Sequence, residues 1–401
     1  MTTSPNRGHP ATACALAVAI ALSFCIQPAL AQTDVAWQVT DSANIEVDGD
    51  GFGPVLSPNG RWIAGIKDLD NRQLCIWRVS TGEERCNEES DRVAETSIAW
   101  SPDSRQVAYS QNGAILDSDV FVLDVASNSL TNLTEDDVDD LKASDTAGKF
   151  VIFDEWPVWS PDGEEIVFLR ILNPRDEGAQ RQISVSRVIL DTGQVVRGQD
   201  LLTDEPLELV AEMLGVVLPP VWVENDAVVF AVRGGADIMN IYTVAIPSGP
   251  VSPLDTDPSI PVSNMPLVTG TTPDGDRLTL NWLWEDVAIG GEFYTFGWVD
   301  LDSGEITPIE LDVPRGMGVA APPRFTPDGT AVVFGVTEDE ETHRDSTIVI
   351  QDLESGDTVE IMDGVNLQFW EGVQGIDITE DGQMVLPLDD GSFEVITLEL
   401  P

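Results

Sequence analysis

Positive charge is scarce in this chain of 401 residues. Lys and Arg together number 20 against 70 Asp and Glu, which gives a formal net charge of −50 at pH 7. Lysine occurs only as Lys67, Lys142 and Lys149. A surface this negative repels phosphate groups, so nucleic acid is excluded as a partner. An anionic membrane surface is disfavoured for the same reason.

Histidine is nearly absent, and this limits the catalytic chemistry. His9 and His343 are the two histidines, so no imidazole cluster for zinc or iron exists. A Ser-His-Asp triad would have to use His343, and no Gly-x-Ser-x-Gly elbow or dinucleotide fingerprint is present. His343 and Arg344 in a polar loop are candidates for a ligand-binding face, with ordinary surface residues as the alternative.

Long apolar runs are missing beyond the N-terminus. Residues 13–26 form an apolar stretch that is too short to cross a bilayer comfortably. Arg7 precedes it, and Ala29-Leu30-Ala31 supplies the small residues of a cleavage site. We therefore expect residues 1–31 to be a cleaved secretory signal peptide, with an uncleaved anchor as the alternative. Residues 32–401 would then be periplasmic or secreted, without membrane insertion.

Cysteine is also rare, and two of the four cysteines fall in the expected signal peptide. Cys75 and Cys86 are left as an even pair in an exported protein, where thiols oxidise. They flank the turn signal Ser80-Thr81-Gly82 close to cross-strand register. We predict a disulfide across one hairpin, with two buried thiols as the alternative.

What the sequence does contain is a repeated turn of the Ser-Pro-Asp-Gly kind. Pro sets φ at the second turn position, Asp or Asn tolerates the third, and Gly accepts positive φ. A β-branched run follows each turn, and two further short apolar runs follow it. The equivalent turn positions are residues 58, 102, 161, 224, 273, 327 and 380.

Seven such units without helical periodicity predict an all-β fold, a seven-bladed β-propeller of four-stranded antiparallel blades spanning residues 32–401. The seventh unit has sequence for three strands only. We expect an N-terminal segment, Val35 to Thr40 or Asn44 to Val47, to supply the missing outer strand and to close the ring.

Several of these residues resemble a known repeat family. Trp159-Ser160-Pro161-Asp162-Gly163 followed by Ile166-Val167-Phe168, together with Leu130-Thr131-Asn132-Leu133-Thr134, is similar to TolB-type propeller repeats. The resemblance covers nearly all of residues 50–400. TolB carries an α/β domain ahead of its propeller, and too few residues lie between Gln32 and the first repeat for such a domain. The resemblance therefore implies a TolB-like propeller alone.

Antiparallel strands place the long loops on the face opposite the Ser-Pro-Asp-Gly turns, and we expect ligands there. The long insertions are residues 135–156, 170–181, 199–220, 284–292 and 337–345. The candidate ligand-face residues in or beside them are Asp154, Glu155, Trp156, Arg170, Trp284, His343, Arg344 and Trp370. Trp156, Trp284, Trp370 and Arg170 could stack on a sugar or peptide, or they could complete packing between blades.

Acid-rich segments are candidates for calcium. Asp48 and Asp50 resemble half of a calcium loop, and Asp136 and Asp137 lie in a dense acidic run. The alternative is a solvated charge run, because acids are abundant throughout. No other cofactor is expected. The even spread of carboxylates suggests a halophilic or marine source, in which they keep a protein soluble while salt screens its charge.

The sequence therefore predicts an exported, non-enzymatic and monomeric propeller that binds a protein or a small ligand through its loop-rich face. Two alternatives stay open. One is a carboxylate-dependent polysaccharide lyase or glycosidase with its site at the channel mouth. The other is a calcium-stabilised structural module.

Overall fold

Every regular element that the structure describes is a β-strand. A computed structural model describes residues 37–49, 51–68, 70–94, 97–113, 117–135, 150–174, 182–196, 220–223, 227–234, 238–246, 251–254, 266–286, 291–338, 343–367, 376 and 378–399. Within these ranges, no helix has the length and apolar character that a membrane crossing requires. The expected signal peptide, residues 1–31, lies outside them.

The strands form successive antiparallel groups along the chain. The first group contains β2 (Gly51–Leu56), β3 (Trp62–Lys67), β4 (Gln73–Arg78) and β5 (Glu84–Cys86). The second contains β6 (Ala99–Trp100), β7 (Gln106–Asn112), β8 (Ser118–Asp124) and β9 (Ser129–Asn132). The third contains β10 (Phe150–Trp159), β11 (Glu165–Pro174), β12 (Gln182–Ile189) and β13 (Gln194–Val196).

The later groups repeat this pattern. One contains β14 (Val221–Val223), β15 (Ala227–Gly234), β16 (Ile238–Ala245) and β17 (Val251–Pro253). The next contains β18 (Pro266–Thr271), β19 (Arg277–Asp286), β20 (Gly291–Asp300) and β21 (Ile306–Ile309). The one after it contains β22 (Gly318–Phe325), β23 (Ala331–Thr337), β24 (Ser346–Asp352) and β25 (Thr358–Val365). The degenerate repeat at Trp222 thus forms a regular four-stranded sheet.

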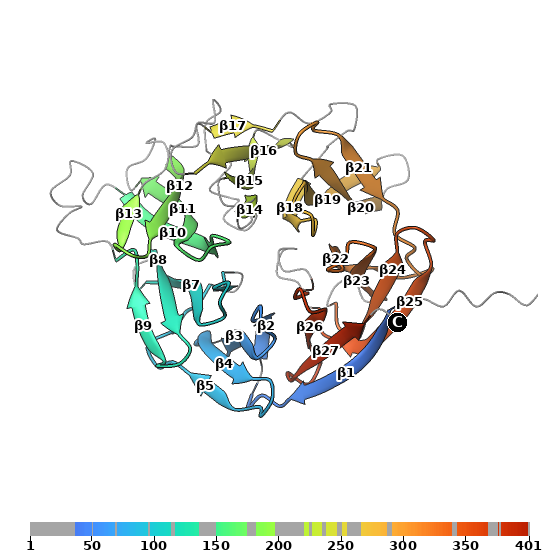
Figure 1. Cartoon of the computed structure of the whole chain (residues 1–401), viewed down its shortest axis with the longest axis horizontal. Helices are drawn as coiled ribbons and strands as arrows, with labels where there is room; N and C mark the ends of the chain where they lie inside the picture. The colour runs from blue at the N-terminus through green and yellow to red at the C-terminus, as the bar shows by residue number, and fades with distance from the viewer. Residues whose placement is uncertain are drawn as a thin grey trace, which may run out of the picture. The chain divides into compact units, whose positions relative to one another are not determined.

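The sheets are arranged as a β-propeller. Figure 1 shows β2, β14, β18 and β22 towards a common centre, while β5, β9, β13, β17 and β21 lie on the outside. Apolar residues fill the joins between neighbouring sheets, as where Val120 and Val122 of β8 pack with Ile166 and Phe168 of β11. This radial packing buries apolar residues between neighbouring sheets and agrees with the predicted all-β propeller.

The repeated turn explains how neighbouring sheets are held together. Its serine and aspartate close the turn, since the Ser101 hydroxyl donates to Asp103 (2.8 Å) and accepts the Gln106 amide (2.9 Å). The tryptophan just before the turn reaches the preceding sheet. The indole nitrogen of Trp100 donates to the Val55 carbonyl (2.9 Å), and that of Trp159 donates to the Ala99 carbonyl (3.1 Å).

The N-terminal and C-terminal ends of the described chain meet in one sheet, as expected. Strand β1 (Gln38–Ile45) pairs antiparallel with β27 (Phe393–Glu399), which in turn pairs with β26 (Gln383–Pro387). The strand spans parts of both segments proposed for it. The pairing covers the long edge of β27, which would otherwise be open to other chains.

The predicted disulfide between Cys75 and Cys86 is present. The two residues are direct register partners on β4 and β5, and their Cα atoms are 4.0 Å apart. A carboxylate oxygen of Glu84 lies within 4.8 Å of both sulfurs. Because the sulfurs are bonded to each other, they offer no thiolate to a metal ion.

Three of the expected loop insertions are partly strand. Residues 150–156 were expected in a loop but belong to β10, and Arg170 to Pro174 extend β11. The apolar run Phe150-Val151-Ile152-Phe153 pairs with residues 171–174, which lengthens the hairpin. In the same way β19 continues to Asp286 and β20 starts at Gly291, so the Trp284 loop is shorter than expected.

Candidate functional site

The extended hairpin of β10 and β11 brings two predicted site residues directly together. Asp154 and Arg170 are register partners on the two strands. A bulge between Glu155 and Val158 shifts the register of the hairpin at a point between this pair and the turn. Both residues lie near the middle of their ten-residue strands, in the half that is remote from the turn at Pro161 and towards the loop-rich face predicted to bind ligands. They stand in strands, not in the loops where they were expected.

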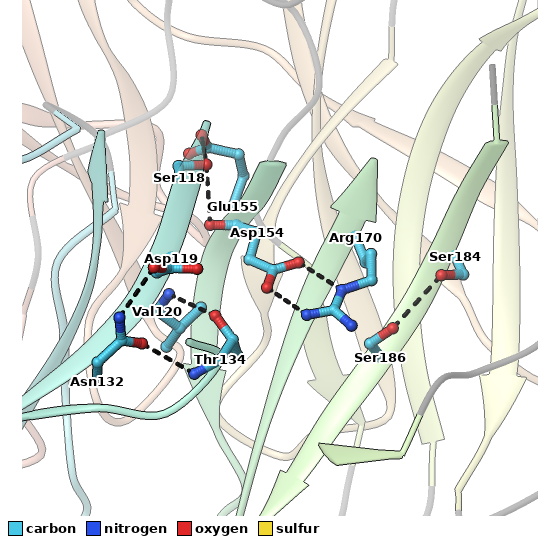
Figure 2. Close-up of polar contacts among 10 residues, drawn as sticks. All are labelled: Ser118, Asp119, Val120, Asn132, Thr134, Asp154, Glu155, Arg170, Ser184 and Ser186. Atoms are coloured by element: carbon cyan, nitrogen blue, oxygen red, sulfur yellow. Dashed lines mark hydrogen bonds and ion pairs between the residues drawn. The ribbon is translucent and has the colours of Figure 1, made fainter. Parts of the chain in front are cut away.

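Asp154 and Arg170 form a bidentate ion pair (Figure 2). Arg170 Nε donates to Asp154 Oδ1 at 2.7 Å, and Nη2 donates to Oδ2 at 2.6 Å. The Asp154 side chain is fully buried, and that of Arg170 is 15% exposed. A parallel pair of charge-assisted hydrogen bonds fixes both side chains in one geometry.

The Arg170 side chain contacts an aromatic residue of its own strand, and Arg170 pairs with a polar residue of the next strand. Its guanidinium carbon lies 5.6 Å from the ring centre of Phe168, which precedes it on the same face of β11. Ser184 is its register partner on β12 and is buried. The Ser184 and Ser186 hydroxyl oxygens are 3.4 Å apart. The row from Asp154 through Arg170 to Ser184 is therefore a polar line across three strands of an otherwise apolar sheet.

The same hairpin is joined to the preceding sheet at this point. Phe153 of β10 forms a parallel bridge with Ser118 of β8, which links the two antiparallel groups into one eight-stranded sheet. The Ser118 hydroxyl is 2.6 Å from Glu155 Oε1 and 3.4 Å from the Asp154 carbonyl oxygen. Figure 2 shows Glu155 extending to Ser118 on one side while Asp154 faces Arg170 on the other.

Three residues of the preceding sheet complete the cluster. Asn132 donates from Nδ2 to Asp119 Oδ2 at 2.8 Å, and its Oδ1 accepts the Thr134 amide at 3.1 Å. The Thr134 hydroxyl accepts the Val120 amide at 3.0 Å and also hydrogen-bonds the Asp154 carboxylate. We refer to Ser118, Asp119, Asn132, Thr134, Asp154, Glu155 and Arg170 as the join cluster.

The pKa values of the carboxyl groups in the join cluster are raised above their ordinary values. Burial raises the pKa of Glu155 to about 7, with the Ser118 hydrogen bond opposing it and the Asp154 charge adding to it. Burial also raises the pKa of Asp119 to about 6, opposed by Asn132 and reinforced by the charges of Asp154 and Asp117. For Asp154, burial raises the pKa while the Arg170 guanidinium lowers it. Desolvation of the charged form is the common cause.

Near neutral pH, the carboxyl groups of the join cluster can exchange protons. Their negative charges can also balance the positive charge of a ligand. The cluster contains three carboxyl groups and one guanidinium, which the bidentate bond to Asp154 already neutralises. An entering cation would stabilise the charged forms of Glu155 and Asp119 and would displace their protons. Alternatively, a carboxyl group with a pKa of about 7 is suited to give or take a proton in general acid–base catalysis.

Of the other predicted ligand-face residues, Trp156, His343 and Arg344 lie outside this cluster. Trp156 is 7% exposed and packs in the apolar contact with the sheet β14–β17, so it serves packing and offers no stacking surface. His343 and Arg344 precede β24 in another sheet, where the His343 carbonyl accepts from Ser346 Oγ (2.8 Å). Trp284 of β19 pairs with Phe293 of β20. The side chain of Trp284 and the whole of Trp370 lie outside the described part.

Three of the four calcium candidates lie outside the described residues. Asp48 is exposed just after β1, and Asp50, Asp136 and Asp137 lie outside the described residues. Within the described ranges, the one group of three potential metal ligands is Cys75, Glu84 and Cys86, and its cysteines are disulfide-bonded. The described residues therefore supply no metal site that fits calcium.

Four members of the join cluster were missed by sequence reasoning, namely Ser118, Asp119, Asn132 and Thr134. The β8 and β9 segments were predicted as ordinary strands of the second unit. A usable signal was present, because polar residues interrupt both segments where their ends approach the loop-rich face. The contact between β8 and β10 is tertiary, and no local pattern reports it.

No protein-family model matches the chain, and no curated protein matches it. Solved structures match it as folds. An oligogalacturonate lyase in complex with manganese aligns with a TM-score of 0.58 at 13% identity, covering 90% of each chain. The β-propeller domain of the Trilobed protease from Pyrococcus furiosus aligns at 0.53 and 16%, covering 84% of this chain and 89% of that one.

TolB from Acinetobacter baumannii also matches, with a TM-score of 0.43 at 17% identity over 80% of this chain and 62% of that chain. At these identities the matches show a shared fold, the β-propeller. They do not transfer an activity, and the low score of the TolB match leaves the predicted TolB-like character as a proposal.

Proposed function

We propose that the chain is an exported binding module whose loop-rich face takes a positively charged group of a protein or small ligand at the join cluster. The observation that carries this proposal is the charge balance there. The cluster holds three carboxyl groups, those of Asp119, Asp154 and Glu155, and a single arginine, which is bound to Asp154. The pKa values of Asp119 and Glu155 are raised to about 6 and about 7. A positive ligand group supplies the compensation that the cluster lacks.

Electrostatics also favour this ligand class over an acidic sugar. The net charge of −50 repels a polyuronate, and the Arg170 guanidinium that would hold a uronate carboxylate is already bound to Asp154. The charge of the whole chain concentrates cations near its surface and speeds their association. A cationic protein segment or amine therefore meets an attractive field on approach.

An enzyme is the second candidate, and Glu155 is the observation in its favour. A carboxyl group with a pKa of about 7 has the protonation behaviour of a general acid for glycoside cleavage or lyase chemistry. In that case a neutral polysaccharide would be hydrolysed, or a uronate-containing one would be cleaved by elimination, and Glu155→Gln would abolish the turnover. A panel of neutral and acidic polysaccharides assayed with both proteins tests this candidate.

The architectural part of the proposal is a seven-bladed, monomeric, TolB-like propeller exported after removal of residues 1–31. Six successive four-stranded groups, followed by the sheet of β26, β27 and β1, support this count of blades. A calcium-stabilised module is a further possibility through Asp48, Asp50, Asp136 and Asp137. Calcium would then raise the melting temperature, and Asp48→Ala or Asp136→Ala would remove the effect.

The binding proposal is tested with a tetralysine peptide as probe and the protein purified from an exporting host. We expect isothermal titration calorimetry to show binding that strengthens between pH 5.5 and pH 8, as Asp119 and Glu155 lose their protons. Glu155→Gln should weaken binding at pH 8 by about fivefold, the effect of roughly 1 kcal/mol. Glu164→Gln is the matched control, because Glu164 is exposed in the same sheet near the opposite face.

Equal weakening by Glu155→Gln and Glu164→Gln would mean that the peptide responds to overall charge only. That result, or an affinity that does not change with pH, would contradict the proposed site. Turnover of a polysaccharide that requires Glu155 would replace the binding proposal with the enzyme candidate.

A further inference from the structure

A groove of about 550 Å³ lies between the sheets β18–β21 and β22–β25, away from the join cluster. Its apolar lining includes Trp298 of β20, Ile309 of β21, and Leu311 and Leu353. All four belong to the hydrophobic contact that packs these two sheets together. Ile309 is buried, whereas Trp298, Leu311 and Leu353 are half-buried. The groove is therefore a place where an inter-sheet core opens to solvent.

Hydrogen bonds fix both walls of the groove. Gln351 is buried, donates from Nε2 to the Glu310 carbonyl (2.8 Å) and accepts the Asp312 amide at Oε1 (2.8 Å). The opposite wall is a turn closed by Asp352, whose Oδ1 accepts the amides of Glu354 (3.0 Å) and Ser355 (2.7 Å). A ligand that enters does not have to order these walls, which lowers the entropic cost of binding.

The rim of the groove is negative. Glu310, Asp312 and Glu354 line it and are exposed, and the described lining contains no lysine or arginine. Arg277 is not part of the lining, although its guanidinium carbon is 5.3 Å from the ring centre of Trp298. An apolar floor below three carboxylates complements a ligand that combines an apolar side chain with a positive charge.

The edge of the adjoining sheet favours an extended peptide as the occupant. Strand β21 is the last strand of its sheet and pairs with β20 alone among the described strands. Figure 1 places it on the outside. Pro308 and Ile309 of this strand line the groove, so a peptide added along the β21 edge would lie beside it. Strand addition gives affinity through the backbone, and a neighbouring pocket gives selectivity.

We propose that this outer groove is a second docking site, which binds a short extended peptide segment carrying Lys or Arg next to an apolar residue. Its volume is in the range of ligand pockets and accommodates a few side chains. The site is independent of the join cluster, and it would let the propeller hold a basic partner at its outer wall as well as at its loop-rich face.

The probe is a fluorescein-labelled peptide of alternating Leu and Lys, with two comparison peptides that replace Leu by Ser or Lys by Glu. We expect fluorescence anisotropy to show tighter binding of the Leu-Lys peptide than of either comparison peptide, because the Ser-Lys peptide keeps only the charges that the join cluster takes. Glu354→Gln should weaken that binding by about fivefold, as expected for one partly solvated charge contact. Leu353→Ser should weaken it further.

Matched controls come from the equivalent turn between β12 and β13. Asp191 and Leu190 occupy the positions that correspond to Glu354 and Leu353, and Asp191 is exposed. Asp191→Asn and Leu190→Ser make the same chemical changes away from the groove. Melting temperatures of all variants show whether a loss of binding is a loss of folding.

Three results would overturn the proposal. Asp191→Asn could weaken binding as much as Glu354→Gln, which would leave only non-specific attraction to an acidic protein. The Ser-Lys peptide could bind as well as the Leu-Lys peptide, which would remove the role of the apolar floor. Glu155→Gln could abolish binding while Glu354→Gln leaves it unchanged, which would assign the peptide to the join cluster.

Discussion

Asp154 and Arg170 face each other across β10 and β11 as a buried, bidentate ion pair, with 2.7 and 2.6 Å between the bonded atoms. Taking two charges out of water is costly, and close geometry offsets this cost only while both partners are present. The pair stands at the join of two sheets and beside two carboxyl groups that hold protons near neutral pH.

The first prediction concerns this pair. Asp154→Asn should lower the free energy of unfolding by about 3–5 kcal/mol, because it leaves the Arg170 charge buried without its carboxylate partner. The double variant Asp154→Leu/Arg170→Met should recover most of that loss, since no buried charge is left. Urea denaturation of the wild type and both variants measures the effect. A loss below about 1 kcal/mol in the single variant would show that the pair is solvated.

The second prediction is a pH dependence of stability with a defined sign. The pKa of Glu155 is raised in the folded protein from 4.5 to about 7, so folding favours its protonated form. Its contribution is fully present below about pH 4.5 and is lost as the pH rises through 7. Asp119 acts in the same direction between 3.8 and about 6.

The free energy of unfolding of the wild type should therefore fall between pH 5 and pH 8. Glu155→Gln should make that fall smaller, by about 3 kcal/mol at most. Denaturant midpoints measured at half-unit pH steps test this, with Glu164→Gln as the control for the change in net charge. Parallel pH profiles for wild type and Glu155→Gln would refute the proposed proton on Glu155.

The third prediction concerns the disulfide. Cys75 and Cys86 are 11 residues apart, so their bond closes a short loop in the unfolded chain. Reduction, or the variant Cys75→Ser/Cys86→Ser, should lower the free energy of unfolding by about 2–3 kcal/mol. Urea unfolding with and without a reductant provides the measurement. Identical midpoints would mean that the bond does not form in the purified protein.

The strands could be predicted from the sequence because their signals are local. Turn residues such as Pro161 and Gly163 mark where the strands reverse, and the flanking β-branched runs are separated by those turns alone. Asp154 and Arg170 come together because a hairpin fixes which residues approach each other. Their direct pairing depends on a bulge between Glu155 and Val158, which shifts the register by one residue.

The rest of the join cluster could not be predicted because it depends on contact between sheets. Ser118 meets Glu155 through the parallel bridge of β8 with β10, between residues far apart in the sequence. The pKa shifts of Asp119 and Glu155 arise from burial in that contact, and burial is a property of the assembled fold. Trp156 follows the packing alternative, since it is 7% exposed in an apolar contact between sheets.

The fourth prediction follows from the abundance of acids. With 70 Asp and Glu against 20 Lys and Arg, repulsion among carboxylates should dominate the surface electrostatics in dilute buffer. Molar salt screens charges beyond about 3 Å, so the melting temperature should rise as NaCl increases from 0.05 M to 2 M. Differential scanning calorimetry measures this. Greatest stability in dilute buffer would contradict the halophilic interpretation.

The most direct test of the central claim is the number of protons released when a cation binds. Calorimetric titrations of tetralysine at pH 6.5, in two buffers with different ionisation enthalpies, report that number. The join-cluster proposal predicts net proton release by the wild type, a clear reduction of that release in Glu155→Gln, and no change in Glu164→Gln. Binding without proton release, or equal release by all three proteins, would contradict the proposal that the cation enters the join cluster.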